Sequence, residues 1–221
     1  MAAIMYEGRD RVKVIAINGS PRKNGNVTRC LEIMAKEFEK EGIEFEALQP
    51  GPGVHPCMAC YKCLDTGSLH CIRTDDMVNE IIDKCIEADG IILASPVYHG
   101  GIAGGMKCVM DRVMLAAGCG ENQFHHKVGA ALCTLRRSGG METYQQLLGI
   151  MDAMEMVIVT SDYWGAVHGA DPGEALQDTE GIEVAAKLAR NISWVVKVIN
   201  AAKGTIDPPM THKRTFTYFI R

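Results

Sequence analysis

The stretch Lys13-Val-Ile-Ala-Ile-Asn-Gly-Ser-Pro-Arg-Lys-Asn-Gly-Asn-Val27 decides the fold of this chain. It opens within an apolar run, residues 12–17, of the kind that forms a strand buried on both faces of a parallel sheet. A polar loop with two glycines covers residues 19–26, and a helical pattern starts where the loop ends. The free N–H groups and the dipole of a helix N-terminus favour an anion at that point. The stretch therefore predicts a strand, a phosphate-binding loop and a helix.

Side chains of this loop add possible donors to a phosphate. Hydroxyl, amide and guanidinium groups are all present, and the guanidinium can form a charged, two-pronged contact. The loop has neither the Walker A spacing nor the dinucleotide spacing Gly-x-Gly-x-x-Gly. A polar turn that only links a strand to a helix is the alternative. The candidate phosphate contacts are Ser20, Arg22, Asn26, Val27 and Thr28.

Bulk properties fit one globular domain, residues 1–221, with its core at about 12–200. A chain of 221 residues is long enough for a substantial core. The net charge of −4 gives no reason to expect nucleic acid or an anionic membrane as a partner. No apolar run approaches a membrane span, and residues 1–10 do not resemble a signal peptide. We therefore expect a cytoplasmic protein.

Apolar runs and helical stripes alternate five times along the chain. Strands are expected at residues 12–17, 45–48, 90–94, 127–135 and 156–160, and a helical pattern follows each of them. Such alternation predicts an α/β fold with a parallel sheet covered by helices on both faces. The tail at about 204–221 is either disordered or packs on a neighbouring subunit, and its aromatic residues favour packing.

Three loops with unusual composition leave the carboxyl ends of the predicted strands, at residues 19–27, 95–101 and 134–140. Ligands of open parallel sheets bind at those ends. The second and third loops are rich in Gly, Pro and Ser, so their backbones can approach a flat ring closely. A phosphate together with a flat ring in this arrangement indicates FMN. The candidate ring contacts are Pro96, Val97, Tyr98, His99, Gly100, Thr134, Arg136, Gly139 and Gly140.

Individual ring contacts have ordinary alternatives. Tyr98 could stack on the ring or be a simple loop aromatic, and for His99 the absence of a chemical role is the stronger reading. Arg136 or Arg137 could stabilise negative charge on a reduced ring, or the two could be a solvated pair. No side chain stands out as a general acid or base, so no catalytic residue is assigned.

Four cysteines form the sharpest motif, Cys57-Met-Ala-Cys60-Tyr-Lys-Cys63 followed after seven residues by Cys71. Four thiolates are what a [4Fe–4S] cluster needs. Zinc, metal-free redox thiols and unrelated buried cysteines remain alternatives. The chain has nine cysteines, and the others mostly fall on apolar stripes and are expected in the core. These others are Cys30, Cys85, Cys108, Cys119 and Cys133.

The motifs Gly19-Ser-Pro-Arg-x-x-Gly-Asn26 and Ser95-Pro-Val-Tyr98 resemble those of the flavodoxin-like NADPH-dependent FMN reductases. With its cysteines, the chain is most similar to the iron–sulfur flavoproteins of that superfamily, over about residues 12–200. The resemblance implies a five-stranded sheet of order 2-1-3-4-5, with a cysteine-rich insertion at about 54–74 after the second strand. It also implies non-covalent FMN, a cluster on the four motif cysteines, and a homodimer or homotetramer.

These features together predict an electron-transfer flavoprotein. A ferredoxin-like donor or NAD(P)H would supply electrons, and a small molecule would accept them. One alternative is a cluster-free NAD(P)H-dependent FMN or quinone reductase with free thiols. Another is a zinc-stabilised, non-enzymatic binding protein on a flavodoxin-like scaffold.

Overall fold

The structure is a computed structural model that describes residues 12–209, 215, 217 and 219. Residues 1–10 lie outside the described residues, as does half of the tail from 204 to 221, so the prediction that the tail packs on a neighbouring subunit is not tested. Within the described part of the chain, no helix has both the length and the apolar character needed to cross a membrane.

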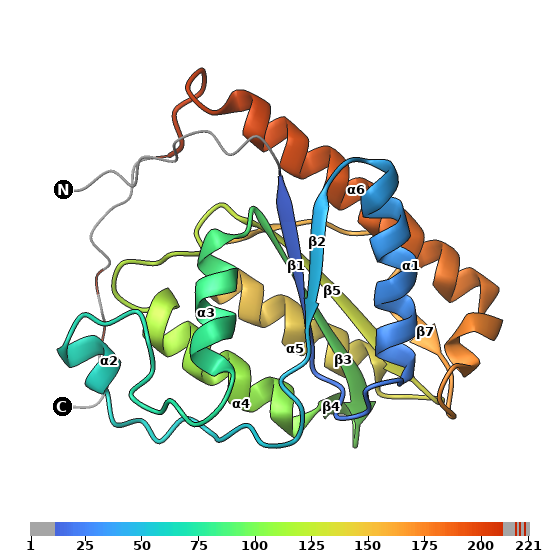
Figure 1. Cartoon of the computed structure of the whole chain (residues 1–221), viewed down its shortest axis with the longest axis horizontal. Helices are drawn as coiled ribbons and strands as arrows, with labels where there is room; N and C mark the ends of the chain where they lie inside the picture. The colour runs from blue at the N-terminus through green and yellow to red at the C-terminus, as the bar shows by residue number, and fades with distance from the viewer. Residues whose placement is uncertain (1–11, 210–214, 216, 218, 220–221) are drawn as a thin grey trace.

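A parallel sheet forms the centre of the molecule (Figure 1). The strands are β1 (Lys13–Asn18), β2 (Glu44–Leu48), β3 (Gly90–Tyr98), β4 (Gly101–Ile102), β5 (Val128–Leu135), β6 (Val157–Ile158) and β7 (Ala166–His168). The order is β2-β1-β3-β5-β6, and β4 pairs with β3 in antiparallel fashion. The predicted α/β fold and its 2-1-3-4-5 strand order are confirmed, with β5 and β6 as the fourth and fifth strands.

Helices cover both faces of this sheet (Figure 1). They are α1 (Asn26–Lys40), α2 (Lys62–Asp65), α3 (Val78–Glu87), α4 (Gly104–Val113), α5 (Gly140–Ala153) and α6 (Thr179–Ala202), with a π-helical turn η1 (Met114–Gly118) and a 3₁₀ turn η2 (Glu174–Gln177). Successive residues of a strand point to opposite faces. Accordingly, Ile15 and Ile17 pack with α3, α4 and α5, whereas Val14 and Ala16 pack with α1 and α6.

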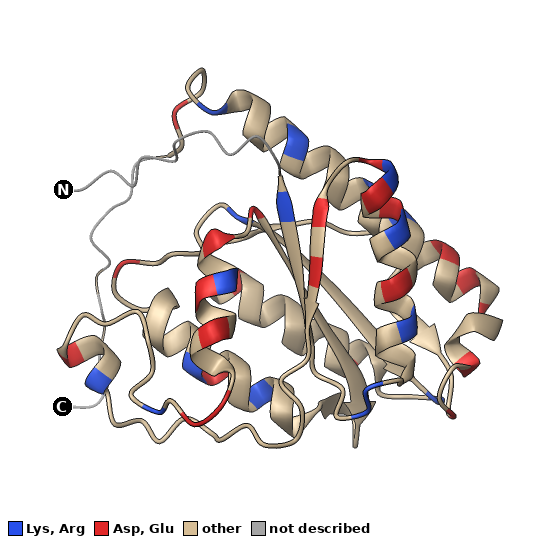
Figure 2. Ribbon diagram, in the orientation of Figure 1, with Lys and Arg blue, Asp and Glu red and all other residues tan. Residues whose placement is uncertain are grey.

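Charged residues lie mainly on the helices, on β2 and at the start of β1 (Figure 2), whereas the central strands β3 and β5 carry none. Residues 14–18 of β1 are buried, and only Lys13 at its start is partly exposed. This burial on both faces explains the apolar run at residues 14–17. Two buried clusters, one on each face of the sheet, make up the core. The sequence pattern thus produces two hydrophobic layers that hold the strand ends, and their loops, in fixed positions.

Two strand predictions need correction. The strand expected at 90–94 continues to Tyr98 and turns back as β4, because Val97 pairs with Ile102 and Tyr98 with Gly101. The strand expected at 156–160 pairs over only Val157–Ile158. The chain then leaves the sheet and returns to the same strand, β5, as β7.

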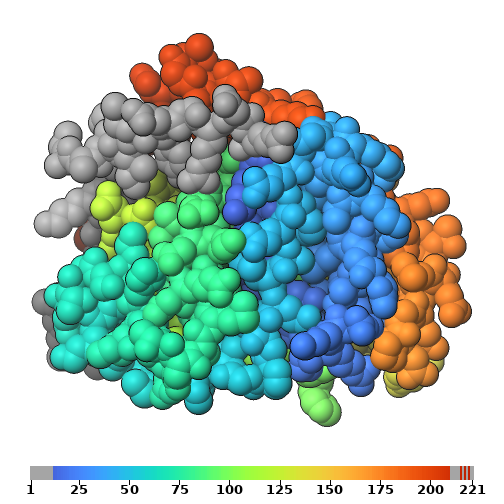
Figure 3. Space-filling model, viewed as in Figure 1, coloured from blue at the N-terminus to red at the C-terminus, as the bar shows by residue number. Residues whose placement is uncertain are grey.

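The cysteine-containing segment, residues 54–74, follows β2 as predicted and includes the short helix α2. It packs beside α3 on the surface (Figure 3) and contacts η1 through α2. Its status as an insertion relative to related proteins stays a prediction.

Candidate functional site

The loops after β1, β3, β5 and β7 all leave the same edge of the sheet (Figure 1). The register places Asn18 beside Ala94, Pro96 beside Thr134, and Leu135 beside His168. The three loops singled out in the sequence are therefore neighbours, and a fourth, residues 169–175, joins them.

The first loop packs tightly against the start of α4. Gly19 donates its N–H to Ala94 O at 2.8 Å. A Cβ at Gly19 would lie 2.7 Å from the Cβ of Met106, closer than real side chains approach. This position therefore requires glycine, and the loop is anchored to both β3 and α4.

Side chains within the first loop hold its shape. The Ser20 hydroxyl accepts a hydrogen bond from Arg22 N at 3.2 Å, and the Thr28 hydroxyl donates to Lys23 O at 2.8 Å. Asn18, which was not among the predicted contacts, accepts a hydrogen bond from Ser20 N and donates one to Thr28 Oγ1, both at 3.0 Å. The hydroxyl contacts to a phosphate remain predictions, since both hydroxyls here serve the loop itself.

The N-terminus of α1 is open for an anion. The helix starts at Asn26, and among the described residues no side chain caps it. The N–H groups of its first turn, Asn26 to Thr28, have no carbonyl partner in a preceding turn. The Arg22 side chain is exposed nearby and forms no ion pair within the described part of the chain. The start of α1 therefore offers an anion both backbone N–H donors and a nearby positive charge.

Asn26 has a structural role that the sequence did not reveal. Its side-chain oxygen accepts hydrogen bonds from the N–H groups of Gly173 at 2.9 Å and Ala175 at 3.2 Å. Gly169 lies so close that a Cβ there would be 2.8 Å from the Asn26 amide nitrogen. The phosphate loop is thereby joined to the loop after β7, which carries no recognisable motif.

The second and third loops touch each other. His99 and Gly100 form the two-residue turn between β3 and β4, with φ of 49° and 78°, the positive values of a type I′ hairpin. Gly139 has φ of 85°, and a Cβ on it would lie 2.9 Å from both Gly100 Cα and Val97 Cγ1. Only glycine allows this approach, which joins the two loops predicted to hold a ring.

The remaining candidates for ring contacts differ in exposure. Tyr98 is 41% exposed at the hairpin, and Arg136 and Arg137 are exposed beside it in the third loop. Thr134 and Gly140 are buried beneath the loops. The exposed groups can meet a ligand directly, whereas the buried pair can act only through the backbone around them.

A separate hollow of about 220 Å³ lies between α1 and β2. Its lining includes Asn18, Thr28 and Gln49 but no residue of the second or third loop. We therefore do not assign it to the ring.

The four motif cysteines line one small cavity of about 20 Å³, together with Arg112 and Leu115 of α4 and η1. Ala59 and Tyr61, between the cysteines, have left-handed φ values of 52° and 55°, which curl the backbone around the cavity. Burial raises the pKa of the Cys63 thiol, and the neighbouring thiols of Cys71 and Cys60 raise it further. The four cysteines thus border one cavity. Among the described residues, however, no three His, Cys, Asp or Glu side chains are grouped closely enough to hold a metal ion.

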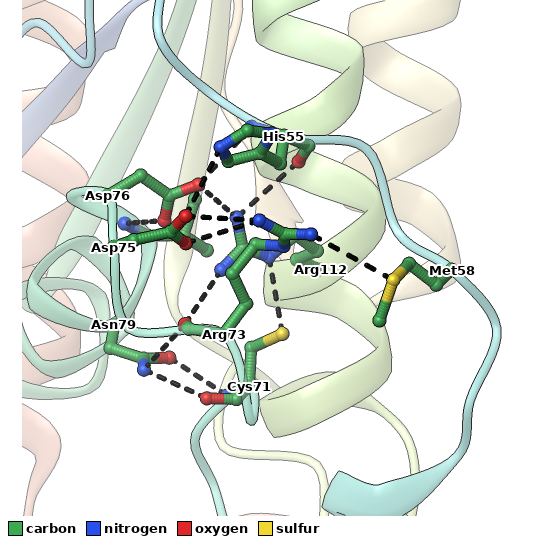
Figure 4. A network of polar contacts seen from close by, with 9 residues as sticks. His55, Met58, Cys71, Arg73, Asp75, Asp76, Asn79 and Arg112 are labelled. Carbon is green, nitrogen blue, oxygen red and sulfur yellow. Dashed lines mark hydrogen bonds and ion pairs between the residues drawn. The ribbon is translucent and has the colours of Figure 1, made fainter.

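Arg112 of α4 connects this cavity to the rest of the molecule (Figure 4). Its guanidinium forms an ion pair with Asp76 and donates to Cys71 Sγ at 3.3 Å. Both charged side chains are buried. The sequence reading missed Arg112 because it sits among methionine and valine residues in an apolar stripe.

The other cysteines are mostly core residues, as predicted. Burial raises the pKa of Cys30, Cys85 and Cys133 to about 12, so their thiols stay protonated near neutral pH. Cys108 is half-buried, and Cys119 is exposed, so the core reading is wrong for Cys119.

The comparisons with known proteins agree with this arrangement. Residues 12–171 match the family model for NADPH-dependent FMN reductases. An iron–sulfur flavoprotein of Methanocaldococcus jannaschii is 39% identical over 197 residues, which cover 85% of this chain and 99% of the relative. One from Methanosarcina thermophila is 32% identical over 194 residues, covering 85% and 97%.

Solved structures show the same fold at lower identity. RosB, crystallised with a flavin-phosphate intermediate, superposes with a TM-score of 0.68 at 15% identity, covering 95% of this chain and 93% of RosB. A flavodoxin, WrbA-like protein from Agrobacterium tumefaciens gives a TM-score of 0.59 at 15% identity, covering 85% and 98%. The chain therefore belongs to the NADPH-dependent FMN reductase family, in the flavodoxin-like superfamily with the iron–sulfur flavoproteins, and it is an FMN-dependent oxidoreductase.

Proposed function

We propose that this oxidoreductase also carries a [4Fe–4S] cluster on Cys57, Cys60, Cys63 and Cys71, and that it transfers electrons between a reduced carrier and a small acceptor. The observation that carries the proposal is the cavity shared by those four side chains. Four thiols around one hollow are the donor set that iron–sulfur clusters use. The curated relatives named iron–sulfur flavoproteins support the same assignment.

We assign the FMN phosphate to the N-terminus of α1. The open N–H groups of Asn26, Val27 and Thr28 bind it there, and Arg22 supplies the charge. Ser20, already within the loop, keeps the backbone in the conformation that aims those groups outward. The ring lies along the second and third loops, where Tyr98 is exposed for stacking and Arg136 can offset negative charge.

When bound, FMN exchanges electrons singly or in pairs and a cluster exchanges them singly, so a chain that holds both can couple a one-electron carrier to a two-electron reaction. The chain's own residues bind and orient these groups. Helix α4 links the two sites, because Met106 packs on Gly19 and Arg112 donates to Cys71. Arg112 lies six positions after Met106 on this helix, a rise of about 9 Å.

We propose the electron donor and the electron acceptor only as chemical classes. A ferredoxin-like protein or NAD(P)H fits as donor, and a small oxidant fits as acceptor. We also propose a homodimer or homotetramer, as the resemblance implies. Equilibrium sedimentation of the holoprotein tests the assembly.

The decisive test compares anaerobically purified wild type with Cys60→Ser and, as a control, Cys119→Ser. Cys119 is exposed and lies outside the cavity. We expect four iron and four sulfide per wild-type chain, loss of iron in Cys60→Ser with FMN retained, and no change in Cys119→Ser.

Two outcomes would overturn the cluster assignment. A wild type with FMN but no iron or sulfide would identify a plain FMN or quinone reductase, the alternative that the lack of a grouped metal site among the described residues favours. A wild type that contains zinc but binds no FMN would identify a zinc-stabilised binding protein, and its lack of flavin would set it apart from the FMN reductase family.

A further inference from the structure

Arg112 is the largest fully buried side chain in the described part of the chain. It lies on α4 between residues of the hydrophobic core, Val109, Met110 and Val113. A buried guanidinium is costly unless its charge is paired and its N–H groups are bonded. Its partners therefore show what holds it there.

One partner accounts for the charge. The carboxylate of Asp76 forms an ion pair with Arg112 Nη1, and the two side chains are 5% and 1% exposed. Asp76 also accepts hydrogen bonds from His55 N and Val78 N, both at 3.2 Å. Burial opposes ionisation, but these bonds keep the pKa of Asp76 below its ordinary value. The pair is satisfied without any help from the cysteines.

The other partners are all on the cysteine segment. Arg112 donates to the carbonyl oxygens of His55 at 3.4 Å and Arg73 at 3.0 Å, just outside the first and last motif cysteines. Its Nε donates to Cys71 Sγ at 3.3 Å. Figure 4 shows the guanidinium in the middle of these groups. One side chain of α4 thus fastens both ends of the segment and points an N–H at a ligand sulfur.

Cys71 is held from a second direction through its backbone. Asn79 of α3 accepts from Cys71 N at 2.8 Å and donates to Cys71 O at 2.9 Å. The backbone of Cys71 is therefore positioned by Asn79, and its sulfur by Arg112. The first three motif cysteines are close in sequence, so the distant fourth is the one whose position most needs outside support.

We propose that Arg112 is a positioning residue of the cysteine site, which fixes Cys71 and raises the reduction potential of a cluster bound there. This inference rests on the proposed cluster. A hydrogen-bond donor and a positive charge beside a ligand sulfur stabilise the more negative, reduced state. Electrons are therefore accepted more easily by a cluster whose Cys71 ligand is paired with Arg112 than by one without that contact.

The test uses the anaerobic holoprotein and three variants. Arg112→Gln alone would leave Asp76 charged and buried, so Arg112→Gln is combined with Asp76→Asn, which keeps the net charge of the protein unchanged. Arg112→Lys keeps the charge but lacks the rigid fork that reaches Asp76 and Cys71 together. Arg73→Gln is the control, because Arg73 lines the same cavity, and within the described part of the chain its side chain contacts Asp75 and Met58 rather than a cysteine.

The measurements are iron, sulfide and FMN content, thermal unfolding of the cluster-free chain, rate of iron loss to a chelator, and separate midpoint potentials for cluster and FMN. In the double variant we expect the reduced-to-oxidised ratio of the cluster at a fixed potential to fall at least tenfold, about 59 mV for one electron. Iron loss is expected to be at least tenfold faster, and the FMN potential unchanged. Arg112→Lys should lower the cluster potential by less than the double variant does. Arg73→Gln should lower it least of the three.

The outcomes separate the two proposals. A wild type without iron and sulfide overturns the cluster and this inference with it. A wild type with iron, beside a folded double variant whose cluster potential and iron loss are unchanged, overturns only the role of Arg112. An equal potential shift in Arg73→Gln also overturns it, because nearby charge alone would then account for the effect. If the double variant does not fold, the test rests on Arg112→Lys. A folded Arg112→Lys with unchanged cluster potential and unchanged rate of iron loss would also overturn the role of Arg112.

Discussion

The side-chain oxygen of Asn26, the first residue of α1, accepts a hydrogen bond from the backbone N–H of Gly173, 147 residues further along the chain. A second bond comes from Ala175 N. The helix N-terminus assigned to the FMN phosphate is thus braced by the loop that follows β7. The amide was expected to contact phosphate directly, but its oxygen serves to position the loop.

Substitution of Asn26 separates these two roles. Asn26→Ala leaves the N–H groups of Gly173 and Ala175 without acceptors, and we expect a loss of about 1–3 kcal/mol in unfolding free energy. Asn26→Asp keeps an acceptor and adds a charge that the helix dipole favours, so stability should be retained. The same charge repels phosphate, so FMN affinity should fall. Urea unfolding of the FMN-free chain and fluorescence titration with FMN measure the two effects. Full FMN affinity in Asn26→Asp would place the phosphate elsewhere.

Arg22→Ala should weaken FMN binding by about 1.5–3 kcal/mol, the range for a hydrogen bond to a charged group. The matched control is Lys36→Ala, which removes the same charge from an exposed position on α1. Lys36 lies ten residues beyond the start of α1, about 15 Å along the axis and past the screening length at physiological salt. Titrations with FMN and with riboflavin, which lacks the phosphate, complete the design. An Arg22→Ala effect of equal size on both flavins would remove Arg22 from the phosphate site.

Hydrophobic patterning predicted most of the fold. Periodicity alone was enough for β1, α1 and the alternation of strands and helices, because residues such as Val14 and Ile15 are buried on opposite faces of the sheet. It failed where backbone pairing continues through residues typical of loops. Pro96 and Gly101 suggested a loop, but both belong to strands, since the positive φ values of His99 and Gly100 allow a tight hairpin.

The candidate site was predictable as a set of loops but not as a set of contacts. Gly19 and Gly139 were recognised as loop glycines, and the structure shows which neighbours each one allows to approach. Arg112 and Asp76 are 36 residues apart, and only the folded chain brings them together. Sequence spacing shows that four cysteines are close along a segment. It does not reveal which charged side chain is buried against them.

Gly139→Ala should disturb the ring site. The new Cβ would lie 2.9 Å from Gly100 Cα, and φ of 85° is unfavourable for alanine. We expect about 1–2 kcal/mol of destabilisation from the backbone alone, together with weaker FMN binding as the hairpin moves. Gly149→Ala is the control on α5, since it is exposed with open space around it. It should stabilise the chain by up to about 1 kcal/mol through helix propensity. Thermal unfolding and FMN titration are measured for both variants. Unchanged FMN binding in a folded Gly139→Ala would show that the contact between Gly139 and Gly100 is not part of the ring site.

Asp178 should make stability depend on pH. It caps α6 by accepting from Gly181 N at 3.0 Å, and it also accepts from His168 N at 2.6 Å. Burial alone would raise its pKa, but these two bonds and the nearby His168 side chain hold the pKa below the ordinary 3.8. Because the folded-state pKa is the lower one, the stabilisation is complete above the ordinary pKa and is lost as pH falls through the folded value.

Asp178→Ala should therefore cost about 0.5–2 kcal/mol at neutral pH, as for other N-cap residues. The difference from wild type should begin to narrow below about pH 4, where the carboxyl of the unfolded state takes up a proton, and should continue to narrow until the folded carboxyl is protonated as well. Asp178→Asn keeps an acceptor without a titrating charge, so its stability should lie between the two at neutral pH and approach that of wild type as the pH falls. Urea unfolding of the FMN-free chain between about pH 7 and pH 3 measures all three. A wild-type advantage over Asp178→Asn that is as large at about pH 3 as at about pH 7 would show that the stabilisation does not depend on the charge of Asp178.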